Sequence, residues 1–422
     1  MRRWFIALTV LALLLGACAD DAAPPTTGPT TTVGVGGIAD EVGALVDETE
    51  RIRGLPFFDE PTVAIISQEE LAERVRQQIE EDLDAEDVAV LQRLYELLGL
   101  LDGTIDLGQA YQDLYAEQVG GYYDNETGEM VISGGSSLSP LSKTIVLHEL
   151  VHALTDAHYG FADRSTALVD ADMFEPAIAL QALVEGDATY FQLLYLQGFS
   201  SEDQQAAILE SLSVDTTVID SLPDWFAEDL TFPYDAGFGF VDRLIQERGI
   251  QGVNQAYEQP PTTTEQILHP EKYFIREPAR EVVLPVVDLT GFEQYEEGIF
   301  GEWNVMLYLL DGVNRGDAVV GSAGWGGDWY RIYWNGTDVA FAYLYEGDTP
   351  RDAVEFAEYL VASVDVSMNV GSPQRSGGIT TFPGADYAFV ELSGQRVLFV
   401  AAFDQQVGVA LVEALRAAGA PG

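Results

Sequence analysis

Apolar positions repeat with the period of a helix over most of residues 38–100, so helices are expected to dominate this stretch. A short apolar run at residues 62–66 interrupts the pattern and predicts one strand. The letters SQEE at residues 67–70 then form a capping box, which predicts the start of a new helix. A helix at about residues 109–118 leads into a hairpin whose second strand covers residues 129–133. These elements are expected to form a scaffold.

Two later segments carry apolar residues around most of their circumference, which is typical of helices buried in a core. The first covers residues 139–156 and begins with a serine and a proline, which favour a helix N-terminus. The second covers residues 177–197 and follows another proline. Shorter helices are expected further on, at residues 237–248 and 263–273. These helices predict one helix-rich domain that covers residues 38–280.

The pattern changes beyond Glu281, where strands become frequent. It predicts a strand at residues 282–287, a helix near residues 300–313, and two hairpins that turn at Asn335-Gly336 and Ser393-Gly394, each followed by a helix. No period of 20–50 residues recurs, which argues against a solenoid or a propeller. The expected fold class is therefore α+β, with an α+β accessory domain at residues 281–422.

The first 37 residues differ from the rest of the chain. Two arginines and the short apolar run 4–15 are typical of a cleaved signal peptide, here residues 1–17, because the run is too short to span a bilayer. The letters LGAC that end at Cys18 resemble the bacterial lipobox, in which the cysteine is lipidated. The alternative is an ordinary secretory signal with an incidental cysteine. Residues 18–37 are rich in Thr, Pro and Gly and predict a flexible tether. We therefore expect an extracytoplasmic protein anchored to the cell membrane by a lipid on Cys18.

The amino-acid composition excludes several kinds of partner and metal site. The chain has 69 acidic and 20 basic side chains, a net charge of −49, which argues against nucleic acid as a partner because the phosphate backbone attracts basic surfaces. A single cysteine excludes intrachain disulfides and thiolate-rich metal sites, so any metal must be held by nitrogen and oxygen. Only four histidines are present, His148, His152, His158 and His269.

Two of these histidines belong to an H-E-x-x-H pattern, His148-Glu149-Leu150-Val151-His152, on the first buried helix. Imidazoles four residues apart share one helix face and can converge on a single metal ion. Glu149 stands one residue from a ligand and is placed to take a proton from a metal-bound water. The rest of the helix is apolar, so three unpaired ionisable groups would each be costly there. This pattern predicts a catalytic metal site.

A third protein ligand would leave one position open for water, and two residues compete for that place. Glu185 lies mid-way along the second buried helix, among apolar residues that offer its carboxylate no cation. His158 is the rival, because residues 148–158 differ by one letter from a metzincin pattern. That letter is Thr155, which stands where the pattern has a glycine that turns the chain out of the helix. This backbone argument favours Glu185 and leaves His158 as the alternative.

The sequence HELVHALTD, residues 148–156, resembles the active-site helix of thermolysin-like gluzincins. The resemblance implies a zincin-like fold for the helix-rich domain, Zn²⁺ held by His148, His152 and Glu185, and Glu149 as the base. Thirty-two residues separate His152 from Glu185, more than in thermolysin itself. More broadly, residues 110–275 are similar to secreted bacterial and archaeal proteins classed as metallopeptidases, a similarity that implies a fold and a site and no particular substrate.

Other polar residues are candidates for supporting roles. His269 could donate a hydrogen bond to the oxyanion, with Tyr234, Tyr257 and Tyr273 as alternative donors. Two acids that follow the motifs could orient the histidine ligands or could simply lie at helix ends or in solvent; they are Asp156 and Asp187. The strand at residues 129–133 is expected either to form the edge of a sheet, where an extended peptide could add by main-chain hydrogen bonds, or to be part of an ordinary hairpin.

The expected function is zinc-dependent hydrolysis of peptide bonds in a peptide or protein substrate at the extracytoplasmic cell surface, with the metal-bound water activated by Glu149. The alternative is a catalytically inactive zincin-fold lipoprotein that acts as a binding or assembly factor. The intact Glu149 favours the enzyme, because a structural metal site has no use for a base at that position.

Overall fold

A computed structural model describes residues 38–59, 61–124, 129–134 and 137–420 of the chain. The expected signal peptide, the tether and Cys18 lie outside these residues. In the part of the chain that is described, no helix is both long and apolar enough to cross a membrane.

The first elements are mostly helical, as the apolar spacing predicts. They are α1 (Ile38–Arg53), β1 (Thr62–Ile66), α2 (Gln68–Asp82), α3 (Ala85–Leu98), α4 (Leu107–Gln118), β2 (Gly121–Asp124) and β3 (Glu129–Ser133). The side chain of Ser67 accepts a hydrogen bond from the backbone N–H of Glu70 at the start of α2, in agreement with the predicted cap. The backbone of Gly99 adopts a left-handed conformation that ends α3.

The three strands form a small sheet in the order β1-β3-β2, with β1 parallel and β2 antiparallel to β3. The prediction that residues 129–133 form an edge strand is therefore wrong. The parallel strand β1 covers one side of β3, and β2 covers the other. The edge strand that faces the interior of the helical half is β2, and its residues line a large cavity.

The middle of the chain is helical. It contains α5 (Pro140–Tyr159), α6 (Phe161–Asp170), α7 (Phe174–Gln197), α8 (Ser201–Ser211), the 3-10 helix η2 (Ile219–Ser221), α9 (Asp224–Arg248), α10 (Ile250–Glu258), α11 (Thr264–Leu268) and α12 (Pro270–Ile275). The helix α9 begins earlier than predicted and accommodates Pro233 in its interior. The predicted helix at residues 263–273 is instead two helices, because Pro270 starts a new one.

The remaining elements build an antiparallel seven-stranded sheet in the order β4-β5-β6-β10-β9-β8-β7. They are β4 (Glu293–Gly298), α13 (Gly301–Gly312), α14 (Arg315–Ser322), β5 (Trp325–Trp334), β6 (Val339–Gly347), α15 (Pro350–Ser367), β7 (Gln374–Ser376), β8 (Ile379–Phe382), β9 (Tyr387–Ser393), β10 (Arg396–Ala402) and α16 (Gln405–Ala417). Both predicted hairpins are confirmed, since β5 pairs with β6 and β9 with β10, and a helix follows each pair.

The predicted strand at residues 282–287 is wrong. Val282 and Leu284 are buried against the sheet, whereas Val283 and Val286 are exposed, so the alternation of apolar positions is real. The segment nevertheless pairs with no described strand, and the guanidinium of Arg331 donates to the carbonyl oxygens of Leu284 and Pro285 instead. An extended segment laid on a sheet face has the same alternation as a strand within a sheet.

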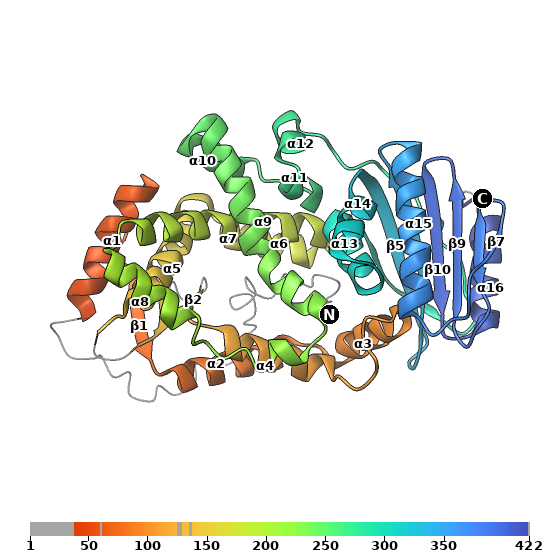
Figure 1. The fold of residues 1–422 in the computed structure, drawn as a ribbon, viewed down its shortest axis with the longest axis horizontal. Coiled ribbons are helices and arrows are strands. Elements are labelled where there is room, and N and C mark those ends of the chain that lie inside the picture. The colour runs from red at the N-terminus through yellow and green to blue at the C-terminus, as the bar shows by residue number, and fades with distance from the viewer. Residues whose placement is uncertain (1–37, 60, 125–128, 135–136, 421–422) are drawn as a thin grey trace.

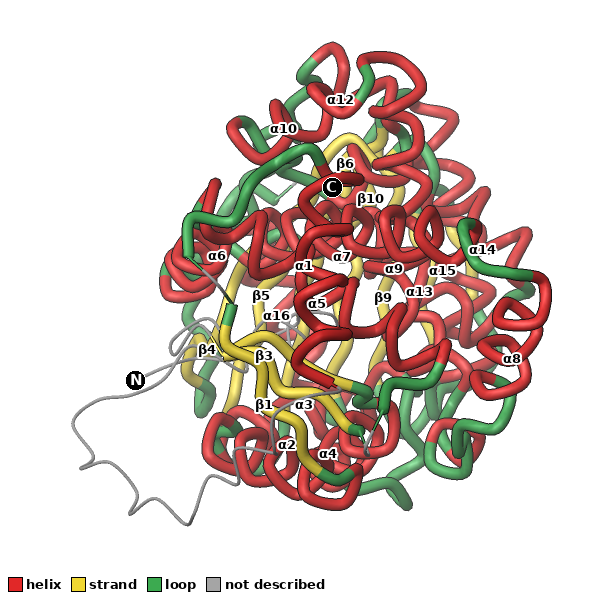
Figure 2. The backbone as a smooth tube through the Cα atoms, turned by 90° about the vertical axis from the view of Figure 1, so that its left-hand side faces the viewer, coloured by secondary structure: helices red, strands yellow, loops and turns green. Residues whose placement is uncertain are grey.

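The fold is mixed α+β, and Figure 1 shows the seven-stranded sheet at one end of the molecule and α1, α5 and α8 at the other. In the same view α2 and α4 run along the lower side, opposite α7. Figure 2 shows α2 and α4 beneath the small sheet formed by β1 and β3. The helical part of the molecule therefore has two layers, one containing α5, α7 and α9 and the other containing α2 and α4.

Buried apolar residues connect the two ends of the molecule. One cluster contains Leu183 of α7 and Phe240 of α9 together with Met306 of α13 and Phe341 of β6. The ring of Phe232 on α9 stacks on Trp303 of α13 with 4.1 Å between centroids. The hydrophobic core thus continues across residue 280.

Candidate metal centre

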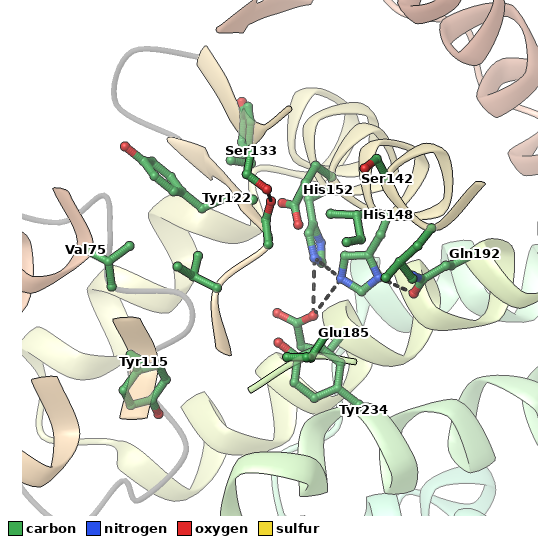
Figure 3. Close-up of a pocket in the computed structure, with 18 of the residues that line it drawn as sticks. Val75, Tyr115, Tyr122, Ser133, Ser142, His148, His152, Glu185, Gln192 and Tyr234 are labelled. Atoms are coloured by element: carbon green, nitrogen blue, oxygen red, sulfur yellow. Dashed lines mark hydrogen bonds and ion pairs between the residues drawn. The ribbon is translucent and has the colours of Figure 1, made fainter. Parts of the chain in front are cut away.

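A cavity of about 710 Å³ lies between the two helical layers. Side chains of α5, α7 and α9 line it on one side, side chains of α2 and α4 on the other, and β2 and the loop after α8 complete its wall. Figure 3 shows His148, His152, Glu185 and Tyr234 together, with Val75 and Tyr115 across the cavity from them. This volume is typical of a ligand-binding cavity.

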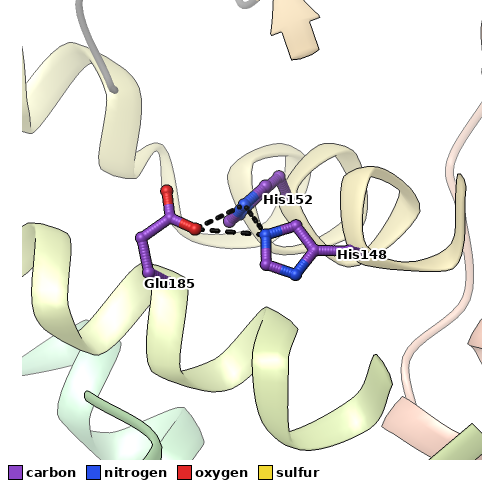
Figure 4. Close-up of side chains that lie close together, drawn as sticks. All are labelled: His148, His152 and Glu185. Carbon is purple, nitrogen blue, oxygen red and sulfur yellow. Dashed lines mark hydrogen bonds and ion pairs between the residues drawn. The ribbon is translucent and has the colours of Figure 1, made fainter. Parts of the chain in front are cut away.

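Three predicted metal ligands meet in this cavity. Nε2 of His148 lies 3.0 Å from Nε2 of His152 and 3.1 Å from Oε2 of Glu185, and the remaining distance, from His152 Nε2 to the same oxygen, is 3.3 Å. The histidines stand one turn apart on α5, and the carboxylate reaches them from α7 (Figure 4). All three residues are buried.

These distances are close to those between the ligands of a tetrahedral metal ion. Nitrogen and oxygen donors held about 2.0–2.2 Å from a tetrahedral zinc ion lie about 3.3–3.6 Å from each other, slightly farther apart than the 3.0–3.3 Å found here. Two imidazole nitrogens at 3.0 Å repel each other if both present lone pairs, and a shared cation removes that repulsion. Two nitrogens and one carboxylate oxygen also form a donor set that suits zinc.

The charges of these groups favour a cation in the same place. Burial alone would raise the pKa of Glu185, but the His152 and His148 rings beside the carboxylate lower it to about 2. Burial alone would lower the pKa of His152, but the Glu185 carboxylate raises it to about 9. Glu185 and His152 therefore favour a proton at the position where the ion would bind, and this proton has to leave when a metal binds.

The orientation of His148 has a visible cause. Its Nδ1 lies 3.2 Å from Oε1 of Gln192, so Nδ1 carries the proton and Nε2 presents its lone pair to the centre. Gln192 stands two turns after Glu185 on α7, and its Nε2 donates to Oγ1 of Thr144. The sequence analysis missed Gln192, although its spacing of seven residues from Glu185 places both side chains on one helix face.

Glu149 also lines the cavity and is only 8% exposed, but it is not one of the three converging ligands. The backbone N–H of Tyr123, on the edge strand β2, donates to its carboxylate. Burial raises the pKa of Glu149, although the His148 and His152 rings oppose the rise. A carboxylate with a raised pKa is a stronger base than a free one, which suits a group that accepts and returns protons.

Two glycines explain how α7 brings Glu185 to this position. A Cβ on Gly186 would lie 2.1 Å from the carbonyl carbon of Gly237 on α9, and a Cβ on Gly237 would lie 2.0 Å from the carbonyl oxygen of Ala182 on α7. The backbones of α7 and α9 therefore cross in direct contact. This crossing places Tyr234 of α9 beside Glu185, as Figure 3 shows.

Replacement of Gly186 by alanine is expected to destabilise the protein by about 1–3 kcal/mol, the cost of overpacking a close contact. The matched control is Gly239→Ala on α9, where a Cβ meets nothing within 4 Å. That control should be neutral or stabilise the helix by up to about 1 kcal/mol, because alanine is the better helix former. Denaturant unfolding followed by circular dichroism measures both changes, and equal stabilities of the two variants would contradict the close crossing.

The rival ligand His158 lies elsewhere. Its Nε2 donates to the carbonyl oxygen of Pro56 at 2.8 Å, and its ring packs on Phe58. The helix α5 continues through Thr155 without a break, and Oγ1 of Thr155 donates to the carbonyl oxygen of Val151. Of the two candidates for the third ligand, the structure brings only Glu185 to the histidine pair.

His269 does not line the cavity. It lies between α11 and α12, where Pro270 turns the chain, and its Nε2 donates to Oε1 of Glu302 on α13 at 3.0 Å. The role of oxyanion donor expected for His269 therefore has no support in this geometry. Of the three alternative tyrosines, only Tyr234 lines the cavity; the hydroxyl of Tyr257 donates to Asp187, and that of Tyr273 donates to the carbonyl oxygen of Gln259.

The two acids considered as partners of the histidines have other contacts. Oδ1 of Asp156 accepts the backbone N–H of Ala162 at the start of α6, so Asp156 lies at a helix end, which was one of the two possibilities considered. Asp187 is fully buried and forms an ion pair of 3.0 Å with Arg53 of α1. Neither acid forms a hydrogen bond with His148 or His152 among the contacts of the described residues.

Comparison with known proteins covers only the other end of the chain. Residues 290–412 match a family model described as a domain of unknown function (DUF8575). The matched residues begin after the predicted domain boundary and include none of the residues that line the cavity. No curated protein matches the chain, and no solved structure matches it.

Proposed function

We propose that this protein is a zinc-dependent peptidase of the thermolysin-like gluzincin type, with a zincin-like fold in its helix-rich half. The observation that carries the proposal is the convergence of His148, His152 and Glu185 within 4.8 Å of one another in a large cavity that Glu149 also lines. A structural metal site is normally closed by four protein ligands, whereas three ligands beside a cavity leave room for a substrate. The proposed location is the extracytoplasmic cell surface, with Cys18 as the lipid anchor.

Each residue of the site has its own role in the proposed reaction. Zinc, when bound, acidifies a coordinated water and polarises a carbonyl group. Glu149 accepts the proton of the attacking water and returns it to the leaving amine, which its raised pKa supports. Glu185 and the two histidines hold the ion, and Gln192 fixes the tautomer of His148.

Tyr234 is the proposed donor to the developing oxyanion. Its ring centroid lies 6.1 Å from that of His148, on the same side of the cavity as the ligands (Figure 3). Burial and the nearby Glu185 and Glu149 carboxylates raise its pKa well above the usual value, so the hydroxyl stays protonated and able to donate.

Tyr234→Phe is expected to lower kcat by about tenfold or more and to leave KM nearly unchanged, because the hydrogen bond forms as charge develops on the oxygen. Zinc content, measured on the same preparation, should equal that of the wild type. A variant that raises KM and keeps kcat would place Tyr234 in substrate binding instead.

The function itself is tested by metal analysis of the protein purified without chelator, together with hydrolysis of an unstructured protein. About one zinc per chain is expected. Zinc affinity should fall as the pH is lowered, because protons compete with the ion for the imidazole nitrogens. Absence of zinc, with no uptake on its addition, would refute the enzyme. One zinc per chain without hydrolysis of any peptide would favour the inactive binding or assembly factor.

A further inference from the structure

We infer that the outer face of α8 rests on the lipid bilayer to which the chain is anchored, and that this contact holds the cavity next to the membrane. The outer face of α8 consists of Ile208 and Leu209 together with Leu212, which directly follows the helix. The inference goes beyond the proposed peptidase activity and rests on the proposed lipid anchor at Cys18.

The three apolar side chains of this face point into solvent. Their exposed fractions are 54% for Ile208, 58% for Leu209 and 77% for Leu212, and the last is the highest among the large apolar residues of the described chain. Residues three and four apart are neighbours on a helix, so the three side chains share one surface. Ala207, on the other side of the helix, is buried, and α8 packs on α5. A cluster of exposed apolar side chains is typical of an interaction site.

The start of α1 lies beside the end of α8. Glu41, in the first turn of α1, accepts the backbone N–H of Leu138 at 3.0 Å. The neighbouring Ser139 donates its hydroxyl to Glu210 of α8 at 2.8 Å. The segment that precedes α5 therefore joins the two helices, at the end of the molecule where Figure 1 shows α1, α5 and α8.

This arrangement brings the outer face of α8 close to lipid. Twenty residues, 18–37, connect the proposed anchor to α1. A chain of twenty residues spans at most about 70 Å when fully extended. Tethering raises the effective concentration of a second contact at the bilayer, so that a weak apolar contact suffices. Stable membrane anchoring generally takes two signals, and the outer face of α8 supplies the second.

The charge around this face determines which lipids it contacts. Residues 201–222 include no lysine or arginine, and Glu202, Asp203 and Asp215 are exposed acids among them. Attraction to anionic headgroups therefore contributes nothing, and the contact is apolar. A bilayer of zwitterionic lipid fits this surface, whereas anionic headgroups repel its acidic side chains.

The same end of α8 forms part of the cavity wall. The residues that line the cavity there are Glu210, Ser213, Val214 and Asp215. Contact between lipid and the outer face of α8 therefore places this side of the cavity at the bilayer surface. A substrate then has to reach the cavity close to the membrane.

Quenching of fluorescence by nitroxide-labelled lipids tests the contact. Cys18 is the only cysteine, and the lipid would occupy its thiol, so a cysteine introduced elsewhere can be labelled selectively. The full-length lipidated variants Leu209→Cys and Leu212→Cys are labelled with a fluorophore and reconstituted into phosphatidylcholine vesicles. The matched control is Val366→Cys on α15, an exposed apolar residue in the half of the molecule opposite α8 (Figure 1).

Strong quenching is expected on α8 alone. An interfacial helix buries its apolar face about 5–10 Å into the boundary of headgroups and acyl chains, so nitroxides there should quench the labels at 209 and 212 several-fold more strongly than the label at 366. The difference should persist at high salt and shrink when phosphatidylglycerol replaces part of the phosphatidylcholine. Equal quenching at the three positions, or none, would overturn the inference. Energy transfer between two copies labelled at 212, without such quenching, would assign the surface to a second copy of the chain.

A charge on the outer face of α8 should abolish the contact. Leu209→Glu, combined with the label at 212, should reduce quenching several-fold, because a carboxylate in the apolar layer is costly. Val366→Glu is the control and should leave quenching unchanged; both positions are exposed, where substitutions disturb folding little. Quenching that survives Leu209→Glu would contradict the inference. The readout involves no hydrolysis, so quenching on α8 in a protein without activity would refute the peptidase and keep the membrane contact, whereas an active peptidase without quenching would do the reverse.

Discussion

Glu149→Gln is expected to lower the rate of peptide hydrolysis by about 100-fold or more while the protein keeps its zinc. The substitution preserves the shape of a side chain that is 8% exposed and removes the group that accepts a proton. General-base contributions are typically about 10²–10⁴-fold. Glu149 lies outside the converging ligand atoms, so the loss should appear in kcat and leave metal affinity nearly unchanged. Steady-state kinetics and metal analysis of one preparation measure both quantities.

The control for this variant is Glu210→Gln, which neutralises another carboxylate of the cavity wall. Glu210 accepts a hydrogen bond from the hydroxyl of Ser139 at the rim, away from the metal ligands. The Glu210→Gln variant should retain most of the activity. Equal activities of Glu149→Gln and the wild type would contradict the assigned role, and equal losses in both variants would attribute the effect to the charge of the cavity.

Glu185→Ala is expected to weaken zinc binding by more than about 100-fold, whereas His158→Ala should change it little. Replacing an outer partner of a ligand already costs about 10- to 100-fold in metal affinity, so the loss of a ligand itself should exceed that range. A carboxylate oxygen of Glu185 is one of the three converging ligand atoms. Without it, the Nε2 atoms of His148 and His152 face each other at 3.0 Å. His158 instead donates to the carbonyl oxygen of Pro56.

Competition with a chromophoric zinc chelator measures both affinities. The His158 variant is a matched control, because it removes an imidazole from the same helix, α5, without touching the cavity. A stronger loss in His158→Ala than in Glu185→Ala would indicate that the metal-bound protein adopts the metzincin arrangement. Unchanged affinity in both variants would exclude the proposed third ligand.

The sequence predicts the helix α5 well because every signal for it is local. Ser139 caps α5, a proline opens it, and Gly160 ends it in a left-handed conformation. Whether two histidines share a face depends only on their spacing of four residues. Glu185 required a different kind of argument, namely that an acid among apolar neighbours needs a cation nearby, and the structure places it beside the histidine rings.

The failures concern contacts between distant segments. The strand at residues 129–133 is central because β1, more than sixty residues earlier, pairs with it in parallel, and nothing within the hairpin reveals that partner. His269 meets Glu302 because α12 turns away at Pro270, which depends on how α11 and α13 pack. Val75 lines the cavity from α2, yet it has the spacing of an ordinary core residue, so the pattern contains no sign of this position.

The core that continues across residue 280 has a consequence for how the cavity is maintained. Phe232, which stacks on Trp303 of α13, stands two residues before Tyr234 on α9, and the indole N–H of Trp303 donates to Asp229 of the same helix. The helix α13, in the C-terminal half of the chain, therefore holds α9 in place next to Tyr234, the proposed oxyanion donor. We expect that loosening the seven-stranded sheet would shift that hydroxyl, although none of the described residues of this sheet lines the cavity. The position of Tyr234 therefore depends on the packing of α9 against α13, and α13 in turn packs against β5 of the seven-stranded sheet.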